Sequence, residues 1–113
     1  MHIPVADRPL SVRDLRAVRQ RLVSMHAHLD EQMDRATTAL DLLRTTADVA
    51  DPEVQPPLMS ALRLLDVAER EASDVIHALT RLADGRYGRC DVCGVQIPVE
   101  VLLDRPLART CGR

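Results

Sequence analysis

Apolar residues recur at steps of three and four along two stretches of the chain, which are separated by a proline-rich segment. No Gly or Pro interrupts residues 11 to 47, and the positions between the apolar residues are mainly Arg, Asp, Glu, Gln and Thr. The apolar positions of this first stretch are Leu15, Val18, Leu22, Met25, Leu29, Met33, Ala36, Leu40, Leu43 and Ala47. This periodicity predicts an amphipathic helix, which at 1.5 Å per residue would be roughly 55 Å long.

The first predicted helix has a recognisable start. Residues 1 to 10 include Pro4 and Pro9 and are expected to form an irregular lead-in, because proline disrupts regular helix. Ser11 is followed three positions later by Asp14. In this S-x-x-D arrangement the hydroxyl and the carboxylate can each accept a hydrogen bond from a free backbone amide. The helix should therefore begin at Ser11.

A second helix is predicted over residues 57 to 84. Its apolar positions are Leu58, Leu62, Leu65, Ala68, Ala72, Val75 or Ile76, Leu79 and Leu82. The pattern ends at Asp84-Gly85, and glycine commonly follows the last turn of a helix. The segment before it, TTADVADPEVQPP, contains three prolines and no positive charge and is expected to form a turn.

Two such helices joined by a short turn predict an all-α fold, an antiparallel coiled-coil hairpin in which each helix covers the apolar face of the other. We expect three parts: the lead-in at 1–10, the hairpin at 11–84 with its tip at 46–57, and a C-terminal module at 85–113. The alternative is that both stripes pack against other chains, since a heptad pattern does not specify its partner.

The composition agrees with a narrow helical core and limits the function. The 113 residues include one Tyr and no Phe or Trp, so Leu, Val, Ala, Ile and Met must form the core. A net charge of −2 argues against a general nucleic-acid binder and against electrostatic membrane attachment. No apolar run is long enough to span a membrane and the start has no signal-peptide character, so we expect a cytoplasmic protein.

The C-terminal module contains all three cysteines. Cys90 and Cys93 form a C-x-x-C motif, Gly94 follows directly, and Cys111 comes seventeen residues later. Cytoplasmic thiols stay reduced, so this pattern indicates metal binding or redox chemistry before it indicates a structural disulfide. The spacing is close to that of a zinc finger, and a thioredoxin-like redox pair is disfavoured because no βαβ pattern surrounds the motif. We therefore expect zinc to bind Cys90, Cys93 and Cys111 and to order a zinc finger.

The sequence does not indicate a special role for the histidines of the two predicted helices. We interpret them as ordinary surface or seam residues: His26, His28 and His77.

The segment ALTRLADGRYGRCDVCGVQIP, followed by a Leu and then RPLARTC, resembles the zinc-finger signature of the DksA/TraR family. The similar features are G-x-Y-G, C-x-x-C-G, Ile97-Pro98, Leu102 and Arg105-Pro106 before Cys111. The match is dense over residues 78 to 112. The family consists of bacterial factors that bind RNA polymerase without binding DNA and insert a helical hairpin into its secondary channel. The resemblance therefore implies a transcription regulator, not an enzyme, with RNA polymerase as its partner and no contact with a membrane; we expect a monomer.

The resemblance also assigns a role to the tip. A D-x-x-D pair stands at the hairpin tip of the family's best-known member, and it maps onto Asp48 and Asp51, which would face the polymerase active site. Carboxylates on a cation-free tip could contact basic residues or perturb a bound magnesium ion. The simpler interpretation is that Asp48 is a solvated residue at a helix end and that Asp51-Pro52 is ordinary turn chemistry.

The chain departs from the family pattern in three ways. The fourth cysteine would fall one residue beyond Arg113, so either the chain has been shortened or the site uses a substitute such as the terminal carboxylate, Asp91 or water. The family's C-terminal helix is missing, and Glu100 and Val101 replace the usual basic residues before Leu102. Two other functions stay open: an adaptor that uses the hairpin for coiled-coil assembly, and a zinc-finger nucleic-acid binder.

Overall fold

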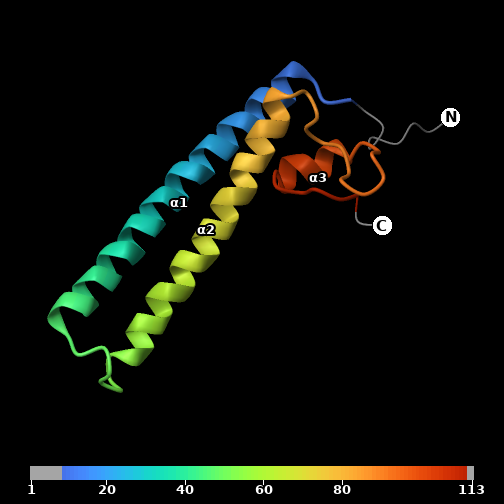
Figure 1. The fold of residues 1–113 in the computed structure, drawn as a ribbon. Helices are drawn as coiled ribbons and strands as arrows, with labels where there is room; N and C mark the ends of the chain where they lie inside the picture. The colour runs from blue at the N-terminus through green and yellow to red at the C-terminus, as the bar shows by residue number, and fades with distance from the viewer. Residues whose placement is uncertain (1–8, 112–113) are drawn as a thin grey trace. The chain divides into compact units, whose positions relative to one another are not determined.

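The computed structural model describes residues 9–111 and contains three helices, α1 (Val12–Thr46), α2 (Gln55–Ala83) and α3 (Val99–Asp104). Within this range there is no strand, only an isolated antiparallel bridge between Arg89 and Gln96. The predicted class, a hairpin of two long antiparallel helices followed by a small cysteine module, is confirmed (Figure 1). Most of the predicted lead-in, residues 1–8, lies outside the described residues.

The chain forms two compact units, and both long helices contribute to each of them. One unit combines the described residues up to Ser24 with those from Asp74 onward, and the other is Met25–Ser73. The first therefore contains the start of α1, the end of α2 and the cysteine module, and the second contains the loop that joins the two helices. The division of the chain at residues 10 and 84 remains a prediction.

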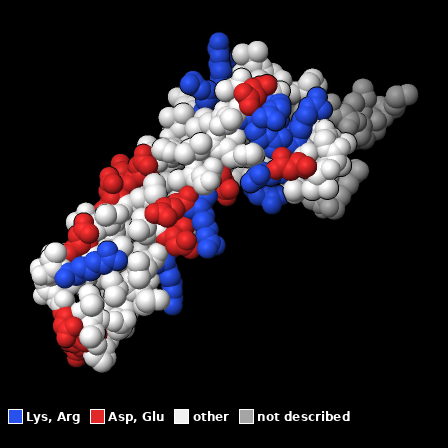
Figure 2. Space-filling view, viewed as in Figure 1, with Lys and Arg blue, Asp and Glu red and all other residues white. Residues whose placement is uncertain are grey.

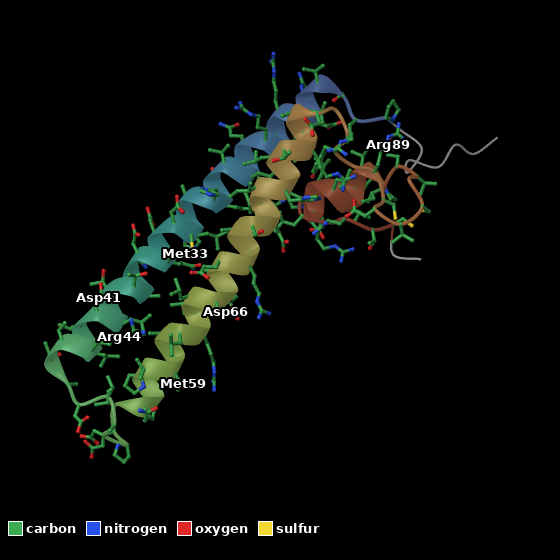
Figure 3. All side chains as sticks on the ribbon, in the orientation of Figure 1. Met33, Asp41, Arg44, Met59, Asp66 and Arg89 are labelled. Carbon is green, nitrogen blue, oxygen red and sulfur yellow. The ribbon has the colours of Figure 1, made fainter. Side chains whose placement is uncertain are left out.

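In the unit Met25–Ser73, α1 supplies large side chains to the helix seam and α2 supplies small ones. Leu29 and Leu40 of α1 are each 4% exposed, and the buried side chains of α2 in this unit are all alanines, namely Ala61, Ala68 and Ala72. Small residues on one helix let the two backbones approach, so that the leucines of the other helix fill the space between them. In Figure 3, Met33 lies on the side of α1 toward α2, whereas Asp41 points away from α2.

In the other unit, the start of α1 packs with the end of α2 around Val18, Leu22, Val75 and Ala78, none of which is more than 6% exposed. The sequence left Val75 and Ile76 as alternatives for one seam position. Val75 occupies it with 0% exposure, and Ile76 is 52% exposed. A rotation of about 100° per residue turns neighbouring side chains to different faces, so only one of the two can enter the seam.

The predicted start of the first helix is confirmed in detail. The backbone N–H of Asp14 donates to the Ser11 hydroxyl at 3.1 Å, and the backbone N–H of Ser11 donates to the Asp14 carboxylate at 2.9 Å. This reciprocal pair is a capping box, which satisfies two amides that have no partner inside the helix. The second helix begins at Gln55, two residues before the predicted start at Pro57. Pro56 and Pro57 fit into its first turn because the amide hydrogens of that turn have no partner inside the helix.

Candidate metal centre and acidic loop

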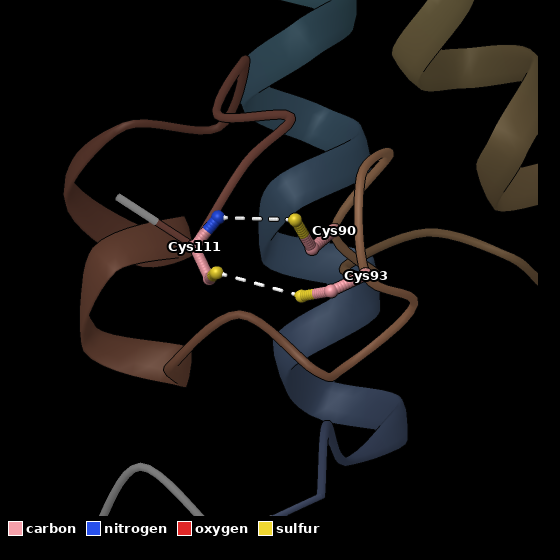
Figure 4. Close-up of side chains that lie close together, drawn as sticks. All are labelled: Cys90, Cys93 and Cys111. Atoms are coloured by element: carbon pink, nitrogen blue, oxygen red, sulfur yellow. Dashed lines mark hydrogen bonds between the residues drawn. The ribbon is translucent and has the colours of Figure 1, made fainter. Parts of the chain in front are cut away.

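The three cysteines lie together in the unit that contains the C-terminal module. The Sγ atoms of Cys93 and Cys111 are 3.6 Å apart, and all three Sγ atoms lie within 4.8 Å of one another (Figure 4). None of the cysteines forms a disulfide. Gly94 follows the C-x-x-C motif with φ +74°, a left-handed conformation that glycine adopts without strain, and its N–H donates to the Cys90 carbonyl at 2.9 Å. This turn directs both thiols of the motif toward Cys111.

The sulfur positions fit a tetrahedral metal ion. Zn–S bonds of about 2.3 Å at tetrahedral angles place two sulfur ligands about 3.8 Å apart. The 3.6 Å separation of the Cys93 and Cys111 sulfur atoms matches this value. Because all three sulfur atoms lie within 4.8 Å of one another, the distances from Cys90 to the other two need to shorten only slightly on metal binding. Soft thiolate ligands in such an arrangement are suited to zinc. The cluster can therefore hold a metal ion at three corners of a tetrahedron.

Backbone amides prepare one of the three thiols for this role. The N–H groups of Val92 and Cys111 each donate to the Cys90 sulfur at 3.4 Å. Hydrogen bonds from the backbone of Cys93, Val92 and Cys111 lower the pKa of Cys90 to about 6, even though burial acts in the opposite direction. The pKa of Cys93 is instead raised, because the neighbouring thiols and desolvation outweigh the hydrogen bond from the Val95 amide. Cys90 therefore ionises before Cys93, and a bound metal cation would favour the thiolate form of its cysteine ligands.

Asp91 was one candidate for a fourth ligand, and the structure excludes it from the cluster. Its Oδ1 accepts a hydrogen bond from Arg81 Nη1 at 2.6 Å, and its Oδ2 accepts one from Arg109 Nε at 2.9 Å. The hydrogen bond from Arg109 is the main reason why the pKa of Asp91 is lowered. Both oxygens are thus occupied by arginines, and no described acidic or histidine side chain joins the three cysteines. The terminal carboxylate belongs to Arg113, outside the described residues.

Two arginines of the long helices hold the cysteine module, and no pattern in the sequence predicted either role. Arg81 of α2, with a side chain only 12% exposed, binds Asp91 and also donates to the carbonyls of Arg86 and Arg89 at 3.2 and 2.6 Å. Arg21 of α1 donates to the carbonyls of Leu103 and Asp104 at 2.5 and 3.3 Å, at the C-terminus of α3. A cation is favourable there because the last helical carbonyls have no partner inside the helix.

The module has an apolar core of its own, formed by Cys90, Ile97 and Leu102 with Tyr87 packed against it. The Tyr87 hydroxyl donates to the Pro106 carbonyl at 2.8 Å. This bond joins the turn before the C-x-x-C motif to the segment that leads to Cys111. Burial of the ring raises the pKa of Tyr87 from 10.0 to about 12, although Arg21 and Arg81 act to lower it.

Tyr87 provides a direct test of how the module packs, because it is the chain's single tyrosine and there is no tryptophan. We expect tyrosinate absorbance to develop near pH 12 in the folded protein and near pH 10 in denaturant. Since folding raises this pKa, the stability contributed by Tyr87 is fully present below about pH 10 and is lost as the pH rises through about 12. A midpoint near 10 in the folded protein would mean that Tyr87 is not buried.

The second candidate site is the loop that joins α1 to α2, where Asp48 and Asp51 start two successive turns. Asp48 Oδ1 accepts a hydrogen bond from the Ala50 N–H, and Asp51 Oδ1 accepts one from the Glu53 N–H, both at 2.9 Å. Both residues are exposed, and within residues 9–111 the Oδ2 of each has no hydrogen bond or ion pair. In Figure 2, red carboxylates lie at this end of the hairpin. Both aspartates thus have the expected turn chemistry, and each also presents one carboxylate oxygen outward.

The three histidines of the long helices lie at the surface or beside the seam, as the sequence suggested. His26 lies 3.4 Å from Asp30 and His28 lies 3.3 Å from Gln32, in both cases one turn apart on α1. His77 is half-buried, and its Nε2 has no hydrogen-bond partner among the described residues. None of the three belongs to a group of side chains that could hold a metal ion.

The chain thus combines a helical hairpin, an acidic joining loop and a compact three-cysteine module. Its structure is similar to that of transcription factor DksA2 from Pseudomonas aeruginosa, with a TM-score of 0.81 and 27% identity over 95% of this chain and 86% of the other. No family model and no curated protein matches the sequence. The shared fold and the cysteine cluster confirm the resemblance to the DksA/TraR family. Separately, no helix among residues 9–111 is long and apolar enough to cross a membrane.

Proposed function

We propose that this DksA-like protein regulates transcription by binding RNA polymerase and inserting the loop that carries Asp48 and Asp51 into the secondary channel, without binding DNA and without enzymatic activity of its own. The observation that carries the proposal is the fold similarity to a transcription factor over 95% of the chain, which includes both the hairpin and the cysteine module. The net charge of −2 supports a protein partner over DNA, since binding DNA requires cationic side chains to neutralise phosphates.

The geometry of the loop supports a role for its two carboxylates. Each aspartate uses one oxygen to hold its own turn, which leaves the other oxygen available to a partner. Residues 45–57 contain no basic side chain that could neutralise these charges from within the loop. A pair of carboxylates fixed in this way can contact arginines or lysines, or change the surroundings of a bound magnesium ion.

We expect Asp48→Asn and Asp51→Asn to keep polymerase binding within about twofold of the parent while weakening the effect on transcription about tenfold or more, equivalent to about 1.4 kcal/mol. Asparagine retains the oxygen that accepts the turn hydrogen bond, so the loop keeps its shape and loses only charge. The measurements are affinity for core RNA polymerase and transcription from a set of promoters in vitro.

Glu53→Gln is the matched control for this pair, because it removes the same charge from an exposed position of the same loop. It should leave both binding and transcription close to the parent. If the parent fails to bind core polymerase at micromolar concentration, the proposed function is wrong. If it binds but the two aspartate variants behave like Glu53→Gln, the loop has no role in the channel.

We further propose that Cys90, Cys93 and Cys111 hold a zinc ion. The ion would link the C-x-x-C turn to the segment around Cys111 and so stabilise the module, and the proposal is supported by the sulfur spacing and by the amides directed at Cys90. We expect about one equivalent of zinc by elemental analysis of protein purified without chelator. Cys111→Ser should reduce this to well below one equivalent, since it removes one of three thiolates.

Asp91→Asn gives the matched comparison for Cys111→Ser. The residue lies next to Cys90, but its carboxylate binds Arg81 and Arg109, so its replacement should leave the zinc content unchanged. Zinc loss in Asp91→Asn, with retention in Cys111→Ser, would contradict this assignment of the ligands. A parent protein that contains little metal and still has a folded module would show that the cluster does not require zinc.

A further inference from the structure

An open groove runs between the first turns of α1 and the last turns of α2, within the unit that contains the cysteine module. Its volume is about 430 Å³. Val12 and Val23 lie along one side, Leu79 and Leu82 along the other, and the side chains of Arg16 and Arg19 also line it. The groove is separate from both the cysteine cluster and the acidic loop.

Part of the apolar surface of this groove does not contribute to the seam of the hairpin. Val12 is 67% exposed and Val23 is 50% exposed, whereas the seam residues of the same helix, Val18 and Leu22, are at most 2% exposed. Ile76 is 52% exposed and precedes Leu79 by one helical turn, so it continues the apolar surface along α2. Aliphatic side chains gathered in a groove, unlike scattered ones, are typical of a surface that binds another protein.

Two arginines beside the groove form no ion pair with any residue from 9 to 111. The segment of α1 from Val12 to Ser24 contains four arginines and a single aspartate. Arg21 binds the end of α3, but Arg16 and Arg19 have no carboxylate within 4.0 Å among the described residues. Both guanidinium groups are therefore available to carboxylates of a partner protein.

We propose that the groove binds an amphipathic helix of a partner protein that carries acidic residues beside its apolar face. The twelve residues from Val12 to Val23 span about 16 Å, the length of three helical turns. Apolar side chains at positions i, i+3, i+4 and i+7 of the partner would pack between Val23 and Leu79, and carboxylates beside them would pair with Arg16 and Arg19.

The groove fits a helix better than other ligands. Nucleic acid is disfavoured because the floor is aliphatic and contains no aromatic side chain on which a base could stack. A small molecule is disfavoured because the groove is open and its polar groups are two arginines on one helix, with no converging donors and acceptors. The inference does not depend on polymerase binding, since it rests on a surface that the acidic loop does not share.

The test uses the full chain and a fluorescent synthetic peptide of about 14 residues, roughly four helical turns. The peptide carries Leu at positions i, i+3, i+4 and i+7 with Glu on both flanks. We expect saturable binding that weakens as salt is raised, and at least tenfold weaker binding of the same peptide with Lys in place of Glu. Vesicles that contain phosphatidylserine serve as the alternative probe and should not bind.

Variants then locate the binding. Val23→Asp and the double variant Arg16→Glu with Arg19→Glu should each weaken peptide binding at least tenfold, while circular dichroism shows that the helices are retained. Leu64→Asp and Arg35→Glu make the same chemical changes at exposed positions of the other unit and should bind like the parent. The proposal is overturned if the Lys peptide binds equally well, if groove variants and controls behave alike, or if the chain binds the vesicles in preference to the peptide.

Discussion

Replacing Leu22 with Asp is expected to destabilise the protein by at least about 4 kcal/mol, enough to unfold a domain of ordinary stability. Leu22 is 0% exposed in the seam between α1 and α2, and it is among the largest fully buried side chains. A carboxylate at this position would lose its hydration, and no buried polar or charged residue among the described ones could compensate it. The measurement is the free energy of unfolding in urea, followed by the helical circular dichroism signal.

Val23→Asp is the matched control, because the same side chain is introduced at the next position of the same helix. Val23 is 50% exposed, so the new carboxylate stays hydrated and the expected change is within about 0.5 kcal/mol. The comparison also tests the alternative in which the apolar stripes pack against other chains. If Leu22→Asp is as stable as Val23→Asp, the seam within the hairpin is not the principal contact of α1.

The second large effect is expected at Gly88, where an added methyl group meets two obstacles. Its φ of +89° is costly for any residue with a side chain, and a Cβ atom would lie 2.9 Å from Leu10 Cδ1 and 3.0 Å from Leu102 Cδ1. Leu102 is 0% exposed in the core of the module and has little room to move. We expect Gly88→Ala to cost about 3 kcal/mol, as the sum of backbone strain and overpacking.

Gly85→Ala separates the two causes. Gly85 has a similar φ of +73°, but a Cβ atom there would meet nothing within 4 Å. Its replacement should therefore cost only the backbone strain, about 1 kcal/mol. Urea unfolding of both variants gives the difference, which measures how tightly the turn before the C-x-x-C motif packs. Equal losses would show that Leu10 and Leu102 move aside without cost.

The sequence predicted the features that depend on local order along the chain. The period of the apolar residues predicted both long helices, and the S-x-x-D pattern predicted where the first one starts. The cysteine spacing predicted that the three thiols would lie in one cluster, as they do. Each of these signals involves residues whose spacing is itself the structural requirement. The D-x-x-D pair was likewise placed correctly in a turn, and its action on polymerase stays a proposal.

Contacts between distant segments were not predictable in the same way. Arg81 and Asp91 are ten positions apart, and Arg21 and Leu103 are 82 apart, so no periodic pattern connects them. All fifteen basic residues of the chain are arginines, and composition could not identify the two that hold the cysteine module. Asp91 was one of three substitutes left open for the fourth ligand, and the sequence could not show that its carboxylate binds Arg81 of α2 and Arg109 of the segment before Cys111.

The division of the hairpin between two units has a consequence for the order of folding. Leu40 and Ala61, buried in the unit that contains the acidic loop, are 21 positions apart, whereas Leu22 and Val75 in the other unit are 53 apart. Bringing the second pair together directly costs about 0.8 kcal/mol more in loop-closure entropy. We therefore expect the two helices to meet first beside the loop and to close toward their far ends, with the arginines that hold the cysteine module coming into place last. During synthesis, more than 80 residues are added after Arg21 before the Leu103 and Asp104 carbonyls that it binds have been made.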